Sequence, residues 1–126
     1  MEMVIGGAFQ GKASFAEKNY PGISWVFGGE ISREELFRAE GIVGFHEFIR
    51  NEMQEGRQVK DIAELLTCRN PDVILVSDEV GYGVVPVDAF DRAYREAVGR
   101  ICTELAACSK KVIRVVCGIG TVIKND

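Results

Sequence analysis

The 126-residue sequence is poor in several residue types, and each shortage excludes a class of protein. It has 3 prolines, one histidine and one tryptophan, and no apolar run approaches the roughly 20 residues that a membrane helix needs. Basic residues do not outnumber acidic ones: the formal net charge is -4 and the pI about 5.1. General binding to nucleic acid or to an anionic membrane surface is therefore not expected. The N-terminus lacks a basic stretch before its apolar residues, so we do not expect a secretory signal there and expect a cytoplasmic protein.

Cysteine spacing also argues against a metal or redox centre. The four cysteines show no C-x-x-C pattern, which disfavours a zinc site or a redox pair: Cys68, Cys102, Cys108 and Cys117. We expect them to be reduced and mostly buried. The length predicts one domain, residues 1–126, without repeats, low-complexity segments or linkers.

Glycine is abundant, with 14 residues, and the first glycine cluster is the most informative part of the chain. A mostly apolar segment, residues 1–5, predicts a strand, and residues 12–18 predict a short helix. The loop between them reads Gly6, Gly7, Ala8, Phe9, Gln10, Gly11, Lys12. A strand, a glycine loop, a lysine and a helix in this order are typical of a phosphate-binding loop, in which backbone N–H groups surround a phosphate and the lysine adds positive charge. We therefore predict that Gly6 to Ser14 bind a nucleotide phosphate, with an ordinary glycine turn as the alternative.

One residue of this loop departs from the pattern. A hydroxyl residue normally follows the lysine and binds the Mg²⁺ that bridges the phosphates, but this position holds Ala13. Ser14 comes one residue later, and a helical step of roughly 100° is expected to turn its side chain away. Phosphate binding is thus better supported than metal-assisted phosphoryl transfer.

The rest of the chain alternates between predicted strands and helices. Strands are expected at residues 23–27, 72–77 and 112–117. Helices are expected at residues 32–40, 42–53, 59–66 and, most clearly, 87–107. The first would begin with a Ser32–Glu35 capping box. The last would have Asp88 as N-cap and an Asp91–Arg95 pair one turn apart. This alternation predicts an α/β fold: a small, mainly parallel sheet with helices on both faces.

Two carboxylates stand at the end of the predicted strand at 72–77. Asp78 and Glu79 are candidates for holding Mg²⁺, and one of them for acting as a base, because ligands bind beyond the carboxyl ends of parallel strands. The alternative is a strand end capped by solvated acids. Glycine-rich segments follow at residues 80–86 and 118–120, so three glycine-bearing strand ends are expected to meet at one rim.

Three segments resemble the adenosylcobinamide kinase / adenosylcobinamide-phosphate guanylyltransferase family. They are Glu79-Val-Gly-Tyr-Gly-Val-Val-Pro86, Ala97-Val-Gly-Arg100 and Val116-Cys-Gly-Ile-Gly120, and the opening glycine loop matches as well. The resemblance implies a P-loop NTPase-like three-layer sandwich that binds GTP or ATP with Mg²⁺ and acts on an adenosylcobinamide-type corrinoid in cobalamin biosynthesis. It implies phosphorylation of the corrinoid side-chain hydroxyl, then GMP transfer through a guanylylated histidine. It also implies a homo-oligomer, with a trimer known in the family.

Carried onto this chain, the resemblance assigns roles to individual residues. Gly6, Gly7, Gly11 and Lys12 would hold the phosphates, and Glu79, Gly81 and Gly83 would line the site. This chain is shorter than the family pattern between the first helix and the strand at 72–77, where relatives carry the histidine.

His46 is the one histidine, and two interpretations of it stay open. It could replace the guanylylated residue, since imidazole is a competent nucleophile. The alternative is a structural histidine at the margin of an apolar helix stripe, which is the more common role of a histidine in that position. The leading hypothesis is a small nucleotide-binding kinase or nucleotidyltransferase of this family. The alternatives are a degenerate, non-catalytic homologue that binds nucleotide or corrinoid or regulates a partner, and a kinase redirected to another small hydroxyl substrate.

Overall fold

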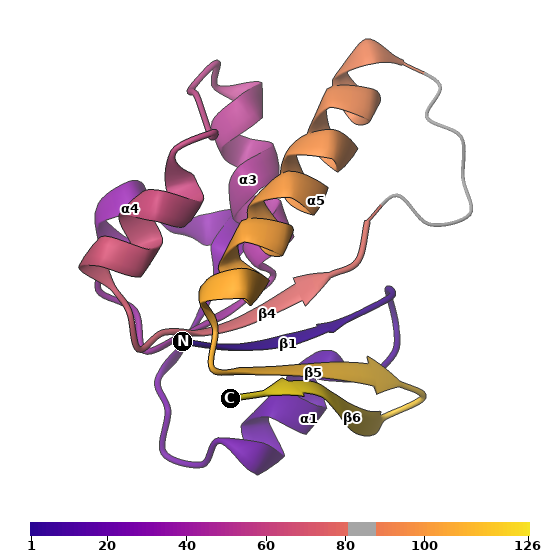
Figure 1. Ribbon diagram of the computed structural model, residues 1–126. Coiled ribbons are helices and arrows are strands. Elements are labelled where there is room, and N and C mark those ends of the chain that lie inside the picture. The colour runs from indigo at the N-terminus through magenta and orange to yellow at the C-terminus, as the bar shows by residue number, and fades with distance from the viewer. Residues whose placement is uncertain (81–87) are drawn as a thin grey trace.

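The computed structural model of the protein describes residues 1–80 and 88–126 (Figure 1). The strands are β1 (Glu2–Gly6), β2 (Trp25–Phe27), β3 (Gly41–Val43), β4 (Ile74–Asp78), β5 (Lys111–Val116) and β6 (Ile119–Asn125). The helices are α1 (Lys12–Asn19), α2 (Arg33–Leu36), α3 (Phe45–Gln54), α4 (Ile62–Arg69) and α5 (Ala89–Cys108), with a 3-10 turn, η1, at Gly28–Glu30.

The strands form one mainly parallel sheet in the order β2-β3-β4-β1-β5-β6. Among the strand pairs of the described residues, β6 with β5 is antiparallel and the others are parallel. β1 lies between β4 and β5, with Gly6 opposite Asp78 and Ile5 opposite Arg114. The carboxyl end of β1, where the glycine loop begins, is therefore flanked by the ends of β4 and β5.

Helices cover both faces of this sheet and define three layers. Figure 1 shows α3, α4 and α5 on one side of the sheet and α1 on the other. The larger core cluster joins the sheet to the first group and includes Phe45, Ile62 and Ile101. The smaller cluster joins it to α1 through Val4, Ala16 and further apolar residues of β4 and β5. The predicted α/β architecture, a mainly parallel sheet with helices on both faces, is thus confirmed.

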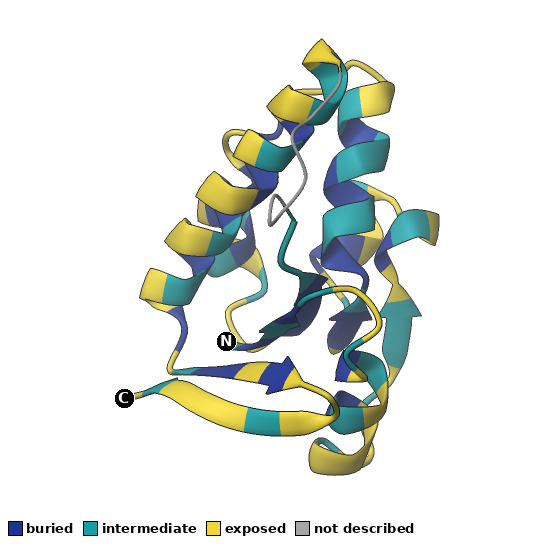
Figure 2. Ribbon diagram, turned by 90° about the vertical axis from the view of Figure 1, so that its right-hand side faces the viewer, coloured by how far each residue is buried: buried dark blue, intermediate teal, exposed yellow. Residues whose placement is uncertain are grey.

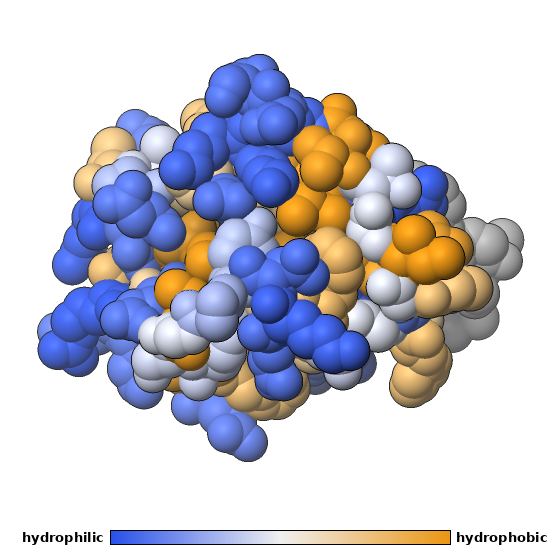
Figure 3. Space-filling view, turned by 90° about the horizontal axis from the view of Figure 1, so that it is seen from below, coloured by the Kyte–Doolittle hydropathy of each residue, from blue (hydrophilic) through white to orange (hydrophobic). Residues whose placement is uncertain are grey.

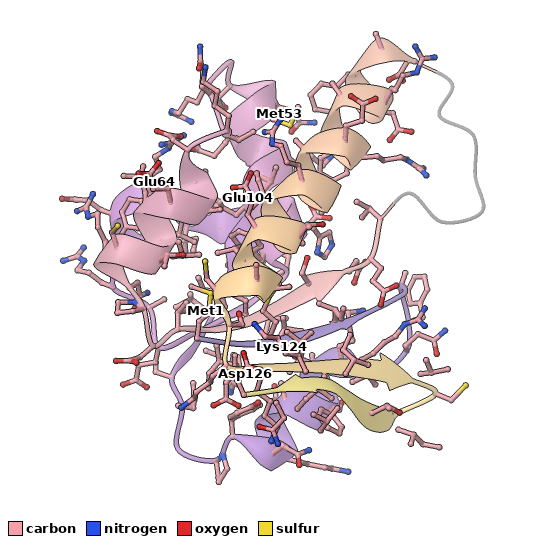
Figure 4. All side chains as sticks on the ribbon, in the orientation of Figure 1. Met1, Met53, Glu64, Glu104, Lys124 and Asp126 are labelled. Atoms are coloured by element: carbon pink, nitrogen blue, oxygen red, sulfur yellow. The ribbon has the colours of Figure 1, made fainter. Side chains whose placement is uncertain are left out.

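Both ends of α5 are capped by polar side chains. At its N-terminus Asp88 accepts the N–H of Asp91 at 2.6 Å, as the sequence predicts, and Arg95 pairs with Asp91 at 3.0 Å. At the other end the Lys124 ammonium donates to the carbonyls of Ala106 and Ala107 at 3.0 and 2.9 Å, beside the last turn of the helix (Figure 4). A cation there satisfies carbonyls that have no partner within the helix.

The predicted helix at residues 42–53 is wrong in its first part. Gly41–Val43 form β3, which pairs with both β2 and β4, and the helix begins only at Phe45. Gly44 separates the two with φ 75°, a left-handed conformation that glycine adopts without strain. The helix predicted at 32–40 is also shorter, because α2 ends at Leu36, although the Ser32–Glu35 capping box is present.

β6 is a strand that was not predicted from the sequence. Cys117 and Gly118, both with positive φ, make a two-residue turn of the kind that joins antiparallel strands, and β6 follows. The segment at 118–120 is therefore a hairpin turn and the start of a strand. The helix predicted at 87–107 is α5, which begins at Ala89, after the extended N-cap Asp88, and ends at Cys108; residue 87 lies outside the described residues.

The cysteines are more exposed than expected. Cys68, Cys108 and Cys117 are exposed and Cys102 is partly buried. Burial raises the pKa of the Cys102 thiol to about 11. Of the helices that the structure describes, none is long and apolar enough to cross a membrane.

Candidate functional site

The glycine loop forms a tight turn from β1 into α1. A Cβ at Gly6 would lie 2.5 Å from the carbonyl oxygen of Val115, so the strand end leaves no room for a side chain. Gly11 has φ 83° and is the residue before the helix. Ala8 and Phe9 form the exposed tip of the loop, and Phe9 also has a positive φ of 62°. The predicted strand, glycine loop and helix are confirmed as a local structure.

Lys12 turns back into the mouth of this loop. It is the first residue of α1 and is buried, and its ammonium donates to the carbonyl oxygen of Gly7 at 2.7 Å. The same nitrogen lies 2.7 Å from Oδ1 of Asp78 at the end of β4. The positive charge is therefore held next to the loop by a carboxylate from the neighbouring strand.

His46 lies beside the same carboxylate. Nδ1 of His46 accepts the backbone N–H of Asp78 at 3.1 Å, and Nε2 lies 3.4 Å from Asp78 Oδ2 and from Glu47 Oε1. Because Nδ1 accepts a hydrogen bond, the neutral ring carries its proton on Nε2, facing the two carboxylates. Lys12, Asp78 and His46 thus form a continuous row of polar groups, which the sequence spacing alone did not reveal.

The fold favours a neutral His46. Burial lowers the pKa of His46 below its ordinary value, and the Lys12 charge acts in the same direction. Asp78 and Glu47 oppose this shift without overcoming it. At neutral pH His46 is therefore uncharged, and its Nδ1 acts as a hydrogen-bond acceptor.

A cavity of about 360 Å³ opens beside this row. Its walls come from the glycine loop and α1, from Phe27, Val43 and Gly44 at the ends of β2 and β3, and from His46, Glu47, Val76 and Asp78. Ala13 and Ser14 both border the cavity. A larger hollow of about 850 Å³ lies near η1, α2 and the end of α3, but the buried Glu52 in its lining is already paired with Arg33 and Arg57. The chemistry-bearing side chains therefore gather at the smaller cavity.

Glu79 points away from Asp78. Its backbone N–H continues the β1–β4 ladder by donating to the Gly6 carbonyl at 2.7 Å, so the two side chains alternate across the sheet. Glu79 instead binds Arg114 on β5 through two hydrogen bonds, of 2.9 and 3.3 Å. The structure does not bring the two carboxylates together as one metal-binding pair. Over residues 1–80 and 88–126, no group of three or more His, Cys, Asp or Glu is placed to hold a metal ion.

The β5–β6 turn supports the glycine loop. Gln10 accepts the N–H of Cys117 with its side-chain oxygen at 2.7 Å and the N–H of Gly118 with its carbonyl oxygen at 2.8 Å. Gln10 therefore fastens the loop to the hairpin, a role that only the unpredicted hairpin could suggest. Three strand ends do meet here, as expected, while Gly81 and Gly83 lie outside the described residues.

Fold and site together define an α/β protein of the P-loop NTPase-like class, with a glycine loop at the end of the central strand. Residues 33–123 match the sequence profile of the family described as cobinamide kinase / cobinamide phosphate guanyltransferase. The chain belongs to this family. The matched range contains His46, Asp78 and Glu79, whereas the glycine loop precedes it.

Two curated relatives show the same similarity over a shorter stretch. The chain is 46% identical over 52 residues to the bifunctional adenosylcobalamin biosynthesis protein CobU of Escherichia coli (strain K12), and equally to that of Salmonella typhimurium (strain LT2). Each match covers 41% of this chain and 29% of the relative. The chain therefore matches less than a third of the length of these relatives.

Proposed function

We propose that the protein binds GTP or ATP at its glycine loop and transfers the terminal phosphoryl group to the side-chain hydroxyl of an adenosylcobinamide-type corrinoid. The observation that carries this proposal is the Lys12 ammonium, held 2.7 Å from Asp78 at the mouth of the loop. Membership of the family supports the reaction class. The two relatives are named as bifunctional adenosylcobalamin biosynthesis proteins, and the match to this chain covers 29% of their length.

The residues of the loop fit a nucleotide phosphate. Gly6 and Gly11 let the backbone approach closely, and the loop runs into the N-terminus of α1, where free N–H groups favour anions. Lys12 would exchange the Gly7 carbonyl and Asp78 for phosphate oxygens. The phosphate would then neutralise the Lys12 charge in place of these two partners.

The residues also fit Mg²⁺ in the manner usual for nucleotide sites. Magnesium is commonly bound by one or two carboxylates together with substrate phosphates and several waters, and Asp78 would hold the ion through one of these waters and not directly, which leaves a carboxylate oxygen for proton transfer. When bound, the ion neutralises negative charge on the transferring group. The Ala13 side chain supplies no oxygen, so a water would take the place of the usual hydroxyl.

Asp78 is the best-placed base for phosphoryl transfer. Once Lys12 turns to the phosphates, the Asp78 carboxylate is free to accept the proton of the acceptor hydroxyl. The acceptor oxygen then bonds to the terminal phosphorus, and the bond from that phosphorus to the bridging oxygen of the nucleoside diphosphate breaks. His46 keeps Asp78 in place by accepting its backbone N–H.

Nucleotidyl transfer through His46 requires a rearrangement. In the arrangement described above, the Nδ1 lone pair is directed at the Asp78 N–H and Nε2 carries the proton. Neither nitrogen is free to attack phosphorus until the ring turns away from Asp78. We therefore propose the kinase reaction as the main activity and regard guanylylation of His46 as the less favoured one.

Calorimetric titration with GTP and ATP, with and without Mg²⁺, tests the proposal in the full chain. Lys12→Ala should weaken nucleotide binding by at least tenfold, because a charge-assisted phosphate contact is lost. Lys18→Ala is the matched control, since Lys18 is an exposed cation on the same helix. Transfer of labelled terminal phosphate to adenosylcobinamide then tests the reaction. Equal binding by both variants would contradict the proposed phosphate site.

Ala13 favours a second candidate, a non-catalytic homologue that binds nucleotide. Loss of the hydroxyl leaves the loop backbone and Lys12 in place but removes a direct contact to the metal. Nucleotide binding that depends on Lys12, with no transfer to adenosylcobinamide at saturating nucleotide, would identify this second function.

A further inference from the structure

Phe27 is a half-exposed aromatic ring held in a fixed position at the end of β2. A Cβ at Gly29 or at Gly44 would lie 2.7 Å from the nearest carbon of this ring, so the ring lies against the backbone of both glycines. The Gly28 backbone packs closely against Gly44, and Asn51 of α3 donates to the carbonyl oxygen of Gly29 at 2.7 Å. The local structure therefore fixes an aromatic residue that is still 46% exposed.

The Phe27 ring borders the cavity beside Lys12, and a second exposed ring does the same. Phe9, at the tip of the glycine loop, lines this cavity together with Phe27. It is fully exposed and has φ 62°, a conformation that costs free energy for a residue with a side chain. Covering such rings with a flat ligand removes apolar surface from water and adds stacking contacts. The two rings are therefore suited to bind a planar group.

The cavity connects the phosphate loop with these rings. Ala13 and Ser14, which follow Lys12 in the first turn of α1, border the same cavity of about 360 Å³. A nucleotide with its phosphates at the glycine loop and the N-terminus of α1 can therefore extend along this turn toward Phe27. Asp78 also borders a separate hollow of about 410 Å³ beside α5. A base in the first cavity thus leaves a second approach to Asp78 for the acceptor.

The surroundings of the Phe27 ring favour binding through the face of a base and not through its edge. Gly44 and Val43 border the cavity next to the ring and have no polar side-chain group. The carboxylate of Glu47, one turn after Gly44, lies 3.4 Å from Nε2 of His46 and belongs to the row of polar groups. Stacking tolerates different bases, because every base has a π face.

We propose that Phe27 and Phe9 bind the base of the nucleotide by stacking, so that the site selects its nucleotide by the area of the base and not by the hydrogen-bond pattern at its edge. A two-ring purine covers more of the aromatic surface than a one-ring pyrimidine. GTP and ATP therefore bind alike, and UTP binds more weakly. The inference rests on the proposed function, because phosphates at the glycine loop bring the base to this cavity.

Calorimetric titration of the full chain with GTP, ATP, UTP and inorganic tripolyphosphate tests the inference, since tripolyphosphate has the phosphates without a base. We expect GTP and ATP to bind within about threefold of each other. Phe27→Leu should weaken both at least about fivefold and leave tripolyphosphate unchanged, because only stacking is lost. Phe9→Leu should act in the same direction. Phe27→Tyr keeps the ring and should bind nucleotides as the unmodified chain does. Val122→Ala, which removes an exposed apolar side chain of β6, is the control.

Two results would overturn the inference and leave the proposed function standing. One is GTP binding that depends on Lys12 but is the same in Phe27→Leu as in the unmodified chain, because the base then lies elsewhere. The other is a preference of more than about tenfold for GTP over ATP that Glu47→Gln removes, because the edge of the base is then recognised by hydrogen bonds. Nucleotide binding that needs Phe27 but not Lys12 supports stacking on Phe27 and overturns the proposed phosphate site. No binding of any of the four probes overturns both.

Discussion

At the scale of single residues, His46 links the protonation state of the site to folding. Its ring is largely buried and accepts a backbone hydrogen bond from Asp78 through Nδ1, which the protonated ring cannot do. Burial lowers the pKa of His46 below 6.5, so the folded chain binds this proton less readily than the unfolded chain. Stability from this group is therefore present above pH 6.5 and lost as the pH falls below it.

His46→Asn should flatten the acidic side of the stability profile. The amide oxygen of asparagine can accept the Asp78 N–H but does not titrate. Urea denaturation between pH 7.5 and 5 measures the difference. We expect the free energy of unfolding of the unmodified chain to fall relative to the variant as the pH drops through about 6.5. Parallel profiles for the two proteins would contradict this account of His46.

Ala13→Ser tests the departure in the glycine loop. A hydroxyl at this position can bind Mg²⁺ directly, so nucleoside triphosphate turnover that depends on Mg²⁺ should rise by about tenfold, equivalent to about 1.4 kcal/mol of barrier. Ser14→Ala is the matched control, because it removes a hydroxyl from the adjacent position. Steady-state turnover at saturating nucleotide is the measurement. No change, or a fall, would mean that the site does not use this metal geometry.

At the scale of elements, long periodic segments were predictable and short ones were not. The spacing of apolar residues by three and four positions predicted α5. The Ser32–Glu35 and Asp88 caps were predictable because capping depends on residues that are close in the sequence. Gly41–Val43 has too few residues to show a period and becomes a strand by pairing with β2 and β4. β6 was missed because its pairing, too, depends on another strand.

The site was predictable to a similar extent. The glycine loop and Asp78 follow from local order along the chain, so their meeting at one rim could be expected. The row from Lys12 to His46, the division of Asp78 and Glu79 between two faces, and the Glu79–Arg114 pair depend on strand register. Register is set by contacts between distant segments, which one sequence does not display.

The hairpin of β5 and β6 should influence the glycine loop through α1. A Cβ at Gly120 would overlap the ring of Phe15, which lies in α1 only three residues after Lys12. Gly120→Val should therefore destabilise the fold by about 1 to 3 kcal/mol and weaken nucleotide binding, because overpacking shifts the helix that carries Lys12. Thermal denaturation and GTP titration test this, with the exposed Thr121→Val of the same strand as control. Unchanged stability in Gly120→Val would show that Phe15 can move freely.

At the scale of the whole molecule, apolar side chains remain exposed at the β6 edge of the sheet. Ile119 is 70% exposed, and Val116, Val122 and Ile123 are about half exposed. Figure 2 shows β6 as mostly exposed, in contrast to the central strands, and hydrophobic side chains reach the surface in the view from below (Figure 3). Strand edges of this kind favour pairing or packing with another chain unless they are covered.

We expect copies of this chain to cover that edge in solution. Light scattering should then give a mass that is a multiple of 13.9 kDa, three chains being the number implied by the resemblance to the family. Ile119→Lys combined with Val122→Lys places charge on the exposed apolar surface and should shift the mass toward one chain. Glu64→Lys changes charge on α4, away from this edge, and should leave the mass unchanged. A mass of one chain for the unmodified protein would contradict self-association, and a multiple that survives the double substitution would place the interface on another surface.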